Sequence, residues 1–236
     1  MERSIPDDAL IRGTLMGRTQ IETRLLEGCW RLAMKGFFNT PANSFSMRIP
    51  GTMEMILASG HKHWRQIGMA DLQTASLLAR EGVSGLHASI YQERVDVGAV
   101  AISSPEGVRL LARYGGLLPP IFDEQVRHLG SSVGPLPDAQ KARGDMVRKT
   151  FRRGANAALL GNRLLCLGMT CDRVLFNTEL FEKCARAYVI AKASGSRIGF
   201  IPVWVRVIAK RRLLKDERRA AASYRNGQIP EGTIAY

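Results

Sequence analysis

The sequence predicts an α/β fold in which helices cover both faces of a sheet. Short apolar or alternating segments typical of strands interleave with amphipathic segments typical of helices, without strict βαβ regularity. The chain has 236 residues, of which 45% are hydrophobic and 23% are charged, an ordinary composition for a globular protein. This length suits one large domain or two small ones, and such a chain buries roughly 70% of its unfolded surface.

In the first third of the chain, the residue pattern predicts an irregular lead-in, then a helix and a β-hairpin. Residues 1–19 have weak periodicity, whereas apolar side chains then recur at helical spacing until Gly36. Alternating residues on both sides of Pro50-Gly51 indicate two strands joined by a turn. The expected elements are a helix at 21–35, strands at 45–49 and 53–57, and an extended segment from residue 69.

The remainder predicts further strands between helices. Ser103-Ser104-Pro105 indicates a helix start, because serine caps a helix and proline suits its first turn. Asp138 is a similar cap candidate. The expected elements are helices at 84–94, 104–114, 138–153 and 171–193, and strands at 97–102, 157–160 and 164–167.

The charge balance is strongly basic, with 34 Lys and Arg against 21 Asp and Glu, a net charge of +13. Residues 206–225 hold eight basic and two acidic residues, and a second basic cluster lies at 143–153. Both predict solvated helical faces, and they also suit nucleic acid, an anionic membrane or acidic metabolites as partners. Nucleic acid is the weakest of these, because Phe151 and Tyr224 are the only aromatic residues within the two clusters.

The cysteines and the termini predict a protein of the reducing cytoplasm. The four cysteines show no CxxC or metal-finger spacing, which favours buried free thiols. Asp7 and Asp8 interrupt the N-terminus before any apolar run, so no signal peptide is expected. No apolar stretch approaches the roughly 18–20 residues that a membrane span needs.

Several motifs, in the right order, carry a resemblance to a known family. The sequence reads DVGAVAISSPEGVRLLAR over residues 96–113, after His87-Ala88-Ser89-Ile90-Tyr91. The other landmarks are Asn43-Ser44-Phe45-Ser46-Met47-Arg48, Ala58-Ser59-Gly60, and Leu159-Leu160-Gly161-Asn162 with Gly168. Together these resemble the class II aldolase/adducin family over roughly residues 20–195. The resemblance implies a three-layer α/β/α sandwich with a central, largely antiparallel sheet, then a basic extension at 196–236.

The same alignment of motifs predicts that the usual chemistry is lost. Family enzymes hold a divalent metal with three histidines and use a carboxylate as acid and base. Ile102, Ser104 and Arg163 stand where the resemblance places the histidines, and Val83 stands where it places the glutamate. Glu81 and Gly82 replace the paired serines that bind substrate phosphate. We therefore expect no metal at the family position and no cofactor.

The remaining candidates for catalysis are Arg163 and a histidine pair. Arg163 can hold a carboxylate or phosphate bidentately or steady an enolate oxygen, or it can simply pair with Asp123 or Glu124. His61 and His63 are candidate bases, or metal ligands with Asp123, Glu124 or His128, or exposed loop residues. The predicted catalytic set is Arg163, His61, His63, Asp123 and Glu124.

The candidate anion-binding residues lie in the loops that the resemblance places around the substrate, which we call the cradle. They are Asn43, Ser59, Gly60 and Ser104, with backbone N–H groups as further donors. Ser103 and Ser104 are better explained as helix caps than as nucleophiles, and His87 as a buried hydrogen-bonding residue.

Two functions remain open from the sequence. One is an altered enzyme acting on a small anionic, oxygenated substrate by carbon–carbon lysis, decarboxylation, dehydration or isomerisation. The other is a non-catalytic, adducin-like assembly protein whose basic tail binds acidic partners. The resemblance also implies a homo-oligomer, most simply a cyclic tetramer.

Overall fold

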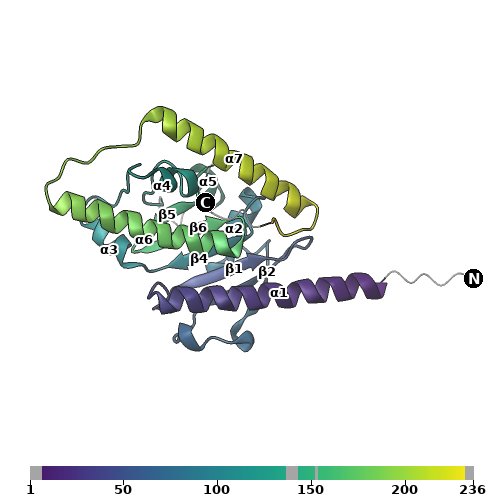
Figure 1. Cartoon of the computed structure of the whole chain (residues 1–236). Coiled ribbons are helices and arrows are strands. Elements are labelled where there is room, and N and C mark those ends of the chain that lie inside the picture. The colour runs from purple at the N-terminus through teal and green to yellow at the C-terminus, as the bar shows by residue number, and fades with distance from the viewer. Residues whose placement is uncertain (1–6, 137–142, 152–153, 232–236) are drawn as a thin grey trace, which may run out of the picture.

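The computed structural model describes residues 7–136, 143–151 and 154–231 (Figure 1). Its core is a six-stranded sheet in the order β3-β2-β1-β4-β6-β5, and every neighbouring pair is antiparallel. The strands are β1 (Ser44–Arg48), β2 (Glu54–Ser59), β3 (Gln73–Ser76), β4 (Ala99–Ser103), β5 (Ala157–Leu160) and β6 (Arg163–Gly168). This confirms the predicted antiparallel sheet.

Helices lie on both faces of this sheet, and Figure 1 shows the resulting layers. The long helices are α1 (Asp7–Met34), α2 (Gly82–Glu93), α6 (Cys171–Ala193) and α7 (Val203–Arg225). The short ones are α3 (Glu106–Ala112), α4 (Asp123–His128) and α5 (Arg143–Thr150), with the 3-10 turns η1 (Trp64–Gln66) and η2 (Met69–Asp71).

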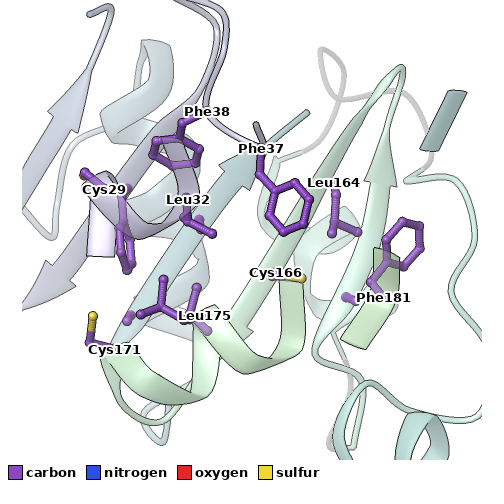
Figure 2. Close-up of a cluster of buried hydrophobic side chains, with 14 of the residues drawn as sticks. Cys29, Leu32, Phe37, Phe38, Leu164, Cys166, Cys171, Leu175 and Phe181 are labelled. Carbon is purple, nitrogen blue, oxygen red and sulfur yellow. The ribbon is translucent and has the colours of Figure 1, made fainter. Parts of the chain in front are cut away.

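The larger part of the core lies between the sheet and helices α1, α3 and α6 (Figure 2). Phe45 and Cys166 point from the strands into this side, where Leu32 of α1 and Phe181 of α6 meet them. The second part lies under α2 and α5 and contains Ile102. Because side chains alternate along a strand, β4 sends Ala101 to the first side and Ile102 to the second. The α/β/α sandwich expected from the sequence is therefore present.

Strand register brings five chain segments to one end of the sheet, which we call the Arg163 end. Ser44 pairs with Ser59 of β2 and with Ile102 of β4. Arg163 pairs with Leu160 of β5. Strands β1 and β6 therefore begin at this end, while β2, β4 and β5 finish there.

Three local predictions differ from the structure. Helix α1 begins at Asp7, so residues 7–19 of the expected lead-in are helical, because extending an existing helix costs little even without an apolar stripe. The segment from residue 69 begins as a 3-10 turn, since Asp71 Oδ2 accepts the N–H of Gly68 at 2.8 Å. Of the helix expected at 138–153, α5 covers Arg143–Thr150. The remaining positions include 138–142 and 152–153, which lie outside the described residues.

The four cysteines are free and buried, as the spacing predicted. Burial raises the pKa of the Cys166 and Cys171 thiols to about 12, which leaves them protonated and inert near neutral pH. Within the described ranges, no helix is both long enough and apolar enough to cross a bilayer.

The C-terminal segment folds onto the body of the protein. Helix α7 packs against α4, and its Leu213 and Ala220 form a small buried cluster with Met169. Glu217 is only 4% exposed, and its Oε1 accepts hydrogen bonds from Arg94 Nη2 at 3.0 Å and Gly154 N at 3.1 Å. The division into a family domain and a basic extension at 196–236 stays a prediction, but α7 is a packed helix.

Candidate functional site

Predicted site residues from three adjacent strands meet at the Arg163 end of the sheet. Asn43 Nδ2 donates to Ser104 Oγ at 2.8 Å, which joins the start of β1 to the end of β4. Arg163 Nη1 donates to the carbonyl oxygen of Ala42 at 2.8 Å, which joins β6 to the same loop. The structure thus brings Asn43, Ser104 and Arg163 together at this end of the sheet.

The side chain of Asn43 stabilises the loop that precedes β1. Its side chain is 1% exposed, and Oδ1 accepts the N–H groups of Asn39 at 3.0 Å and Thr40 at 2.9 Å. The carbonyl of Thr40 in turn accepts the indole N–H of Trp64 at 2.8 Å. Asn43 therefore shapes the cradle, and the hydroxyl of Ser104 is left able to donate its proton outward.

Ser59 and Gly60 lie next to Asn43 across the β1–β2 hairpin. Gly60 has φ +73° and no heavy atom within 4 Å of where a Cβ would stand, so its backbone is open to a neighbour. A positive φ favours glycine, which explains the residue at this turn.

A cavity of about 640 Å³ opens beside this end of the sheet, on the side of α3 and α6. Ser104 and Asn162 connect it to the Arg163 end. Its lining residues are Lys35, Gly36, Phe37, Asn39, Thr40, Ser104, Glu106, Arg109, Asn162, Glu182 and Arg186. Three cations thus face two carboxylates around a set of neutral polar groups.

Most of the charges around the cavity are paired with one another. Arg186 lies 2.7 Å from Glu106 and also pairs with Glu182. Lys35 pairs with Glu179 at 2.6 Å. Arg109 is the least closely paired of the three cations, because its only close carboxylate among the described residues is Glu106 at 4.0 Å.

The sequence did not single out Lys35, Arg109, Glu182 or Arg186 as site residues. Lys35 follows the end of α1, Arg109 lies on α3, and Glu182 and Arg186 lie on α6. The Glu182/Arg186 spacing of four residues indicates a shared helix face. It does not reveal that this face turns toward Ser104.

The predicted serine cap of α3 is wrong. Pro105 is the N-cap residue and makes no side-chain cap, whereas Glu182 Oε2 accepts the N–H of Gly107 at 2.6 Å. A carboxylate from α6 thus satisfies the start of α3, where the helix dipole favours negative charge. Ser104 instead donates its backbone N–H to Phe37 O at 2.8 Å.

The three residues that the resemblance places at the family's metal position make other contacts in the structure. Ile102 is 1% exposed and packs with Val100 and Leu165 in the apolar cluster under α2. Arg163 and Ser104 are engaged as described above. Across residues 7–136, 143–151 and 154–231, no three His, Cys, Asp or Glu side chains gather as a metal-binding group.

The histidine pair is split between two surroundings. His61 Nδ1 lies 3.7 Å from Asp71 Oδ1, and the imidazole packs edge-on to Trp64 with ring centroids 5.9 Å apart. Its Nε2 is buried without a hydrogen-bond partner in the described part of the chain. His63 is exposed at the start of η1.

The proposed partners of this pair lie on α4. Asp123 accepts the backbone N–H of Glu124 at 2.9 Å, and Glu124 pairs with Lys183 of α6 at 3.5 Å. His128 packs on Phe176 and contacts Arg173, and burial together with Arg173 lowers its pKa to about 3. Glu124 and His128 therefore contact α6. Arg163 donates its hydrogen bond to Ala42 and not to Asp123 or Glu124, the partners that the sequence also allowed.

His87 is the buried hydrogen-bonding residue that the sequence indicated. It is 0% exposed, with Nε2 2.9 Å from Ser44 Oγ and Nδ1 2.6 Å from Ser46 Oγ. Burial lowers its pKa to about 3, so the ring is neutral near pH 7. It ties α2 to β1 beneath the cradle.

A family model described as "Class II Aldolase and Adducin N-terminal domain" matches residues 23–189, about 70% of the chain. This protein belongs to the class II aldolase and adducin family. The match confirms the resemblance carried by the sequence motifs. A search of curated proteins found no match.

Solved structures share the fold at low sequence identity. The l-fuculose-1-phosphate aldolase of Thermus thermophilus is 17% identical, with TM-score 0.63, over 75% of this chain and 98% of its own. The L-fuculose 1-phosphate aldolase of Glaciozyma antarctica is 16% identical, with TM-score 0.69, over 98% and 97%. An aldolase II superfamily protein of Pseudomonas syringae is 16% identical, with TM-score 0.63, over 89% and 94%. Identities this low establish the fold alone.

Proposed function

We propose that this protein is a divergent class II aldolase-type enzyme that binds a small anionic, oxygenated substrate at the Arg163 end of the sheet. The observation that carries the proposal is the meeting of Arg163, Ser104 and the Asn43 loop beside a cavity of about 640 Å³. Ser104 lines this cavity, and Arg163 lies at the adjoining end of the sheet. A hydroxyl and a guanidinium so placed suit a carboxylate or a phosphate. The sugar-phosphate aldolases that share the fold are named for substrates of this kind.

The chemistry we propose is the stabilisation of negative charge on oxygen. Carbon–carbon lysis, decarboxylation, dehydration and isomerisation next to a carbonyl all pass through an enolate-like state. Arg163 is a permanent cation with a planar array of donors, so it can hold an enolate oxygen without gaining or losing a proton. The proton would move to or from His61 or His63, whose pair lies just beyond the Ser59-Gly60 turn.

We further propose that no divalent metal takes part at the family position, because the side chains there do not fit one. Ile102 has no donor atom, and Arg163 carries a positive charge that would repel the ion. Ser104 is a weak ligand and already accepts a hydrogen bond from Asn43. We derive no step through a metal.

A binding titration tests this function. Isothermal titration with 2-phosphoglycolate, a small molecule that carries both a carboxylate and a phosphate, should give saturable binding. Inorganic phosphate should compete for the same site, and glycerol, which lacks charge, should not. Failure of both anions to bind at millimolar concentration would remove the basis of the proposal.

Two further proposals concern the assembly and the location of the protein. We propose that the protein works as a homotetramer, because closed cyclic symmetry is the common solution in such families. We also propose a cytoplasmic location. The alternative is a non-catalytic, adducin-like assembly protein, and the contacts described at the Arg163 end give it no support of their own.

A further inference from the structure

The segment that joins α6 to α7 carries an unusual charge pattern. Residues 194–215 contain six basic residues and no acidic residue. They are Arg197, Arg206, Lys210, Arg211, Arg212 and Lys215. All except the half-buried Arg206 are exposed, and those five form no ion pair within the described ranges. The segment therefore presents an uncompensated positive surface.

Large apolar side chains are exposed in the same segment. They are Phe200 at 63%, Val203 at 65%, Trp204 at 66%, Val207 at 43% and Ile208 at 45%. Single exposed apolar residues are normal on a protein surface, but a contiguous group marks an interaction site. We call these five residues, with the five exposed basic residues, the α7 surface.

Helical geometry explains why both kinds of side chain share one face. Helix α7 buries Ala209, Leu213 and Ala220 on its inner side. Trp204, Ile208, Arg211 and Lys215 follow one another at intervals of four, three and four residues, so they line the outer side. The first two turns of this outer side are apolar, and the next two are basic.

The α7 surface is held in place by contacts on its inner side. Ile201 donates its N–H to the carbonyl of Pro120 at 2.8 Å, and Ile198 packs against the main core. Farther along the helix, Glu217 is bonded to Arg94, and Asp216 pairs with Arg127. The outer side is thus displayed on a fixed helix, which crosses the top of the molecule in Figure 1.

We propose that the α7 surface docks this protein peripherally on a bilayer with anionic headgroups. Charge complementarity favours this occupant, because a run of basic residues without acidic ones matches a surface of one sign. The aromatic residues favour it too, since tryptophan prefers the interface between headgroups and acyl chains. An amphipathic helix with Trp, Phe and Val on its apolar part and Lys and Arg beside it lies in the plane of the interface. The cytoplasmic leaflet has the required charge.

Vesicle sedimentation of the full chain is the test. The protein should sediment with vesicles of phosphatidylcholine containing 30% phosphatidylglycerol, and at least tenfold less with pure phosphatidylcholine vesicles. Raising the salt to 0.5 M should release it, because added ions screen the basic residues. Brominated lipid should quench Trp204 fluorescence, and a Trp204→Phe variant, which keeps an aromatic ring, should still sediment but lose that quenching.

Matched variants separate the apolar and the basic contributions. Phe200→Ser with Trp204→Ser, and separately Arg211→Gln with Arg212→Gln and Lys215→Gln, should each weaken sedimentation at least tenfold. Met53→Ser with Leu78→Ser, which are 57% and 63% exposed elsewhere, should not. Neither should Lys62→Gln with Arg65→Gln and Lys149→Gln, which remove the same charge. All variants change exposed residues, and circular dichroism should confirm that they fold.

Other outcomes would overturn the proposal. Equal sedimentation with neutral and anionic vesicles would exclude recognition of headgroup charge. A wild-type protein that ignores vesicles, together with a lower mass by light scattering for Phe200→Ser with Trp204→Ser, would make this surface a contact between copies of the chain. Neither result bears on anion binding at Arg163, so the two proposals fail independently.

Discussion

Arg163 reaches across the end of β4 to donate a hydrogen bond of 2.8 Å to Ala42, which precedes β1. The side chain therefore connects two strands that are not neighbours and passes over the strand that ends at Ser103. A guanidinium has five N–H donors, and this bond uses one of them. The others can hold an anion at the Arg163 end of the sheet.

Removing this side chain should weaken anion binding. Arg163→Ala should raise the Kd of 2-phosphoglycolate at least tenfold, about 1.4 kcal/mol, as measured by isothermal titration. Arg163→Lys should recover only part of the loss, because an ammonium cannot reproduce the planar fork. Arg113→Ala, an exposed change at the end of α3, is the control and should leave Kd unchanged. An unfolded Arg163→Ala protein, or an unaltered Kd, would make Arg163 a structural residue.

Elemental analysis addresses the metal. Protein purified without chelators should contain clearly less than one equivalent of zinc, manganese and iron per chain, because Ile102 and Arg163 replace ligands with an alkyl group and a cation. One equivalent lost on Ser104→Ala would contradict this expectation. One equivalent lost on His61→Ala with His63→Ala would place a metal at the histidine pair instead.

The sequence could predict much of the fold because its signals there are local. Alternation at residues 45–49 and the Pro50-Gly51 turn specify a hairpin, and the long apolar helix at 171–193 matches α6 residue for residue. The helical nature of residues 7–20 was missed, because weak periodicity hides a helix that simply continues from a strong one.

The candidate site was only partly predictable, because it depends on contacts between distant segments. Motif spacing identified Asn43, Ser104 and Arg163, which meet through strand register. The role of Glu182 at the start of α3 joins positions 75 residues apart and has no local signature. The burial of Glu217 against Arg94 is similar: an acidic residue in a basic run reads as surface, yet it anchors the helix.

The oligomeric state can be measured directly. Light scattering at micromolar concentration should give about four times the chain mass of 26.1 kDa. This expectation rests on the family resemblance, which implies a cyclic assembly closed by copies of one contact. A mass near that of one chain would refute the tetramer, and the result should be the same with Arg163→Ala if that residue acts only on ligand.

Glu217 should matter far more for stability than a carboxylate in a surface pair. Glu217→Ala removes the acceptor of Arg94 Nη2 and of Gly154 N inside the protein, while Arg94 keeps Asp96 as a partner at 2.7 Å. Hydrogen bonds to charged groups contribute about 1.5–3 kcal/mol each, so we expect a loss of that size. Glu93 pairs with Arg148 at 3.0 Å in a partly exposed setting, so Glu93→Ala should cost under about 1 kcal/mol. Urea unfolding of both variants measures the difference. Similar losses would show that the contacts of Glu217 contribute little to stability.

The buried histidine gives the stability a pH dependence whose sign can be derived. His87 has its pKa lowered by burial to about 3 in the folded protein, against an ordinary value near 6.5 when unfolded. Below about pH 6.5 the unfolded chain binds a proton that the folded one refuses, so the free energy of unfolding falls as the pH falls. One such group lowers it by at most about 1.4 kcal/mol per pH unit. His128, with its pKa lowered to about 3 mainly by burial, acts in the same direction.

Replacing the ring should remove its share of this slope. Urea unfolding of His87→Gln between pH 7 and pH 5 should show a shallower decline than wild type, by up to about 1.4 kcal/mol per pH unit below pH 6.5. His63→Gln, a change at an exposed histidine, should keep the wild-type slope. The absolute stability of His87→Gln at pH 7 does not decide the matter, because Ser44 and Ser46 lose a partner in either case. A slope that is unchanged in His87→Gln would mean that His87 accepts its proton while the protein is still folded.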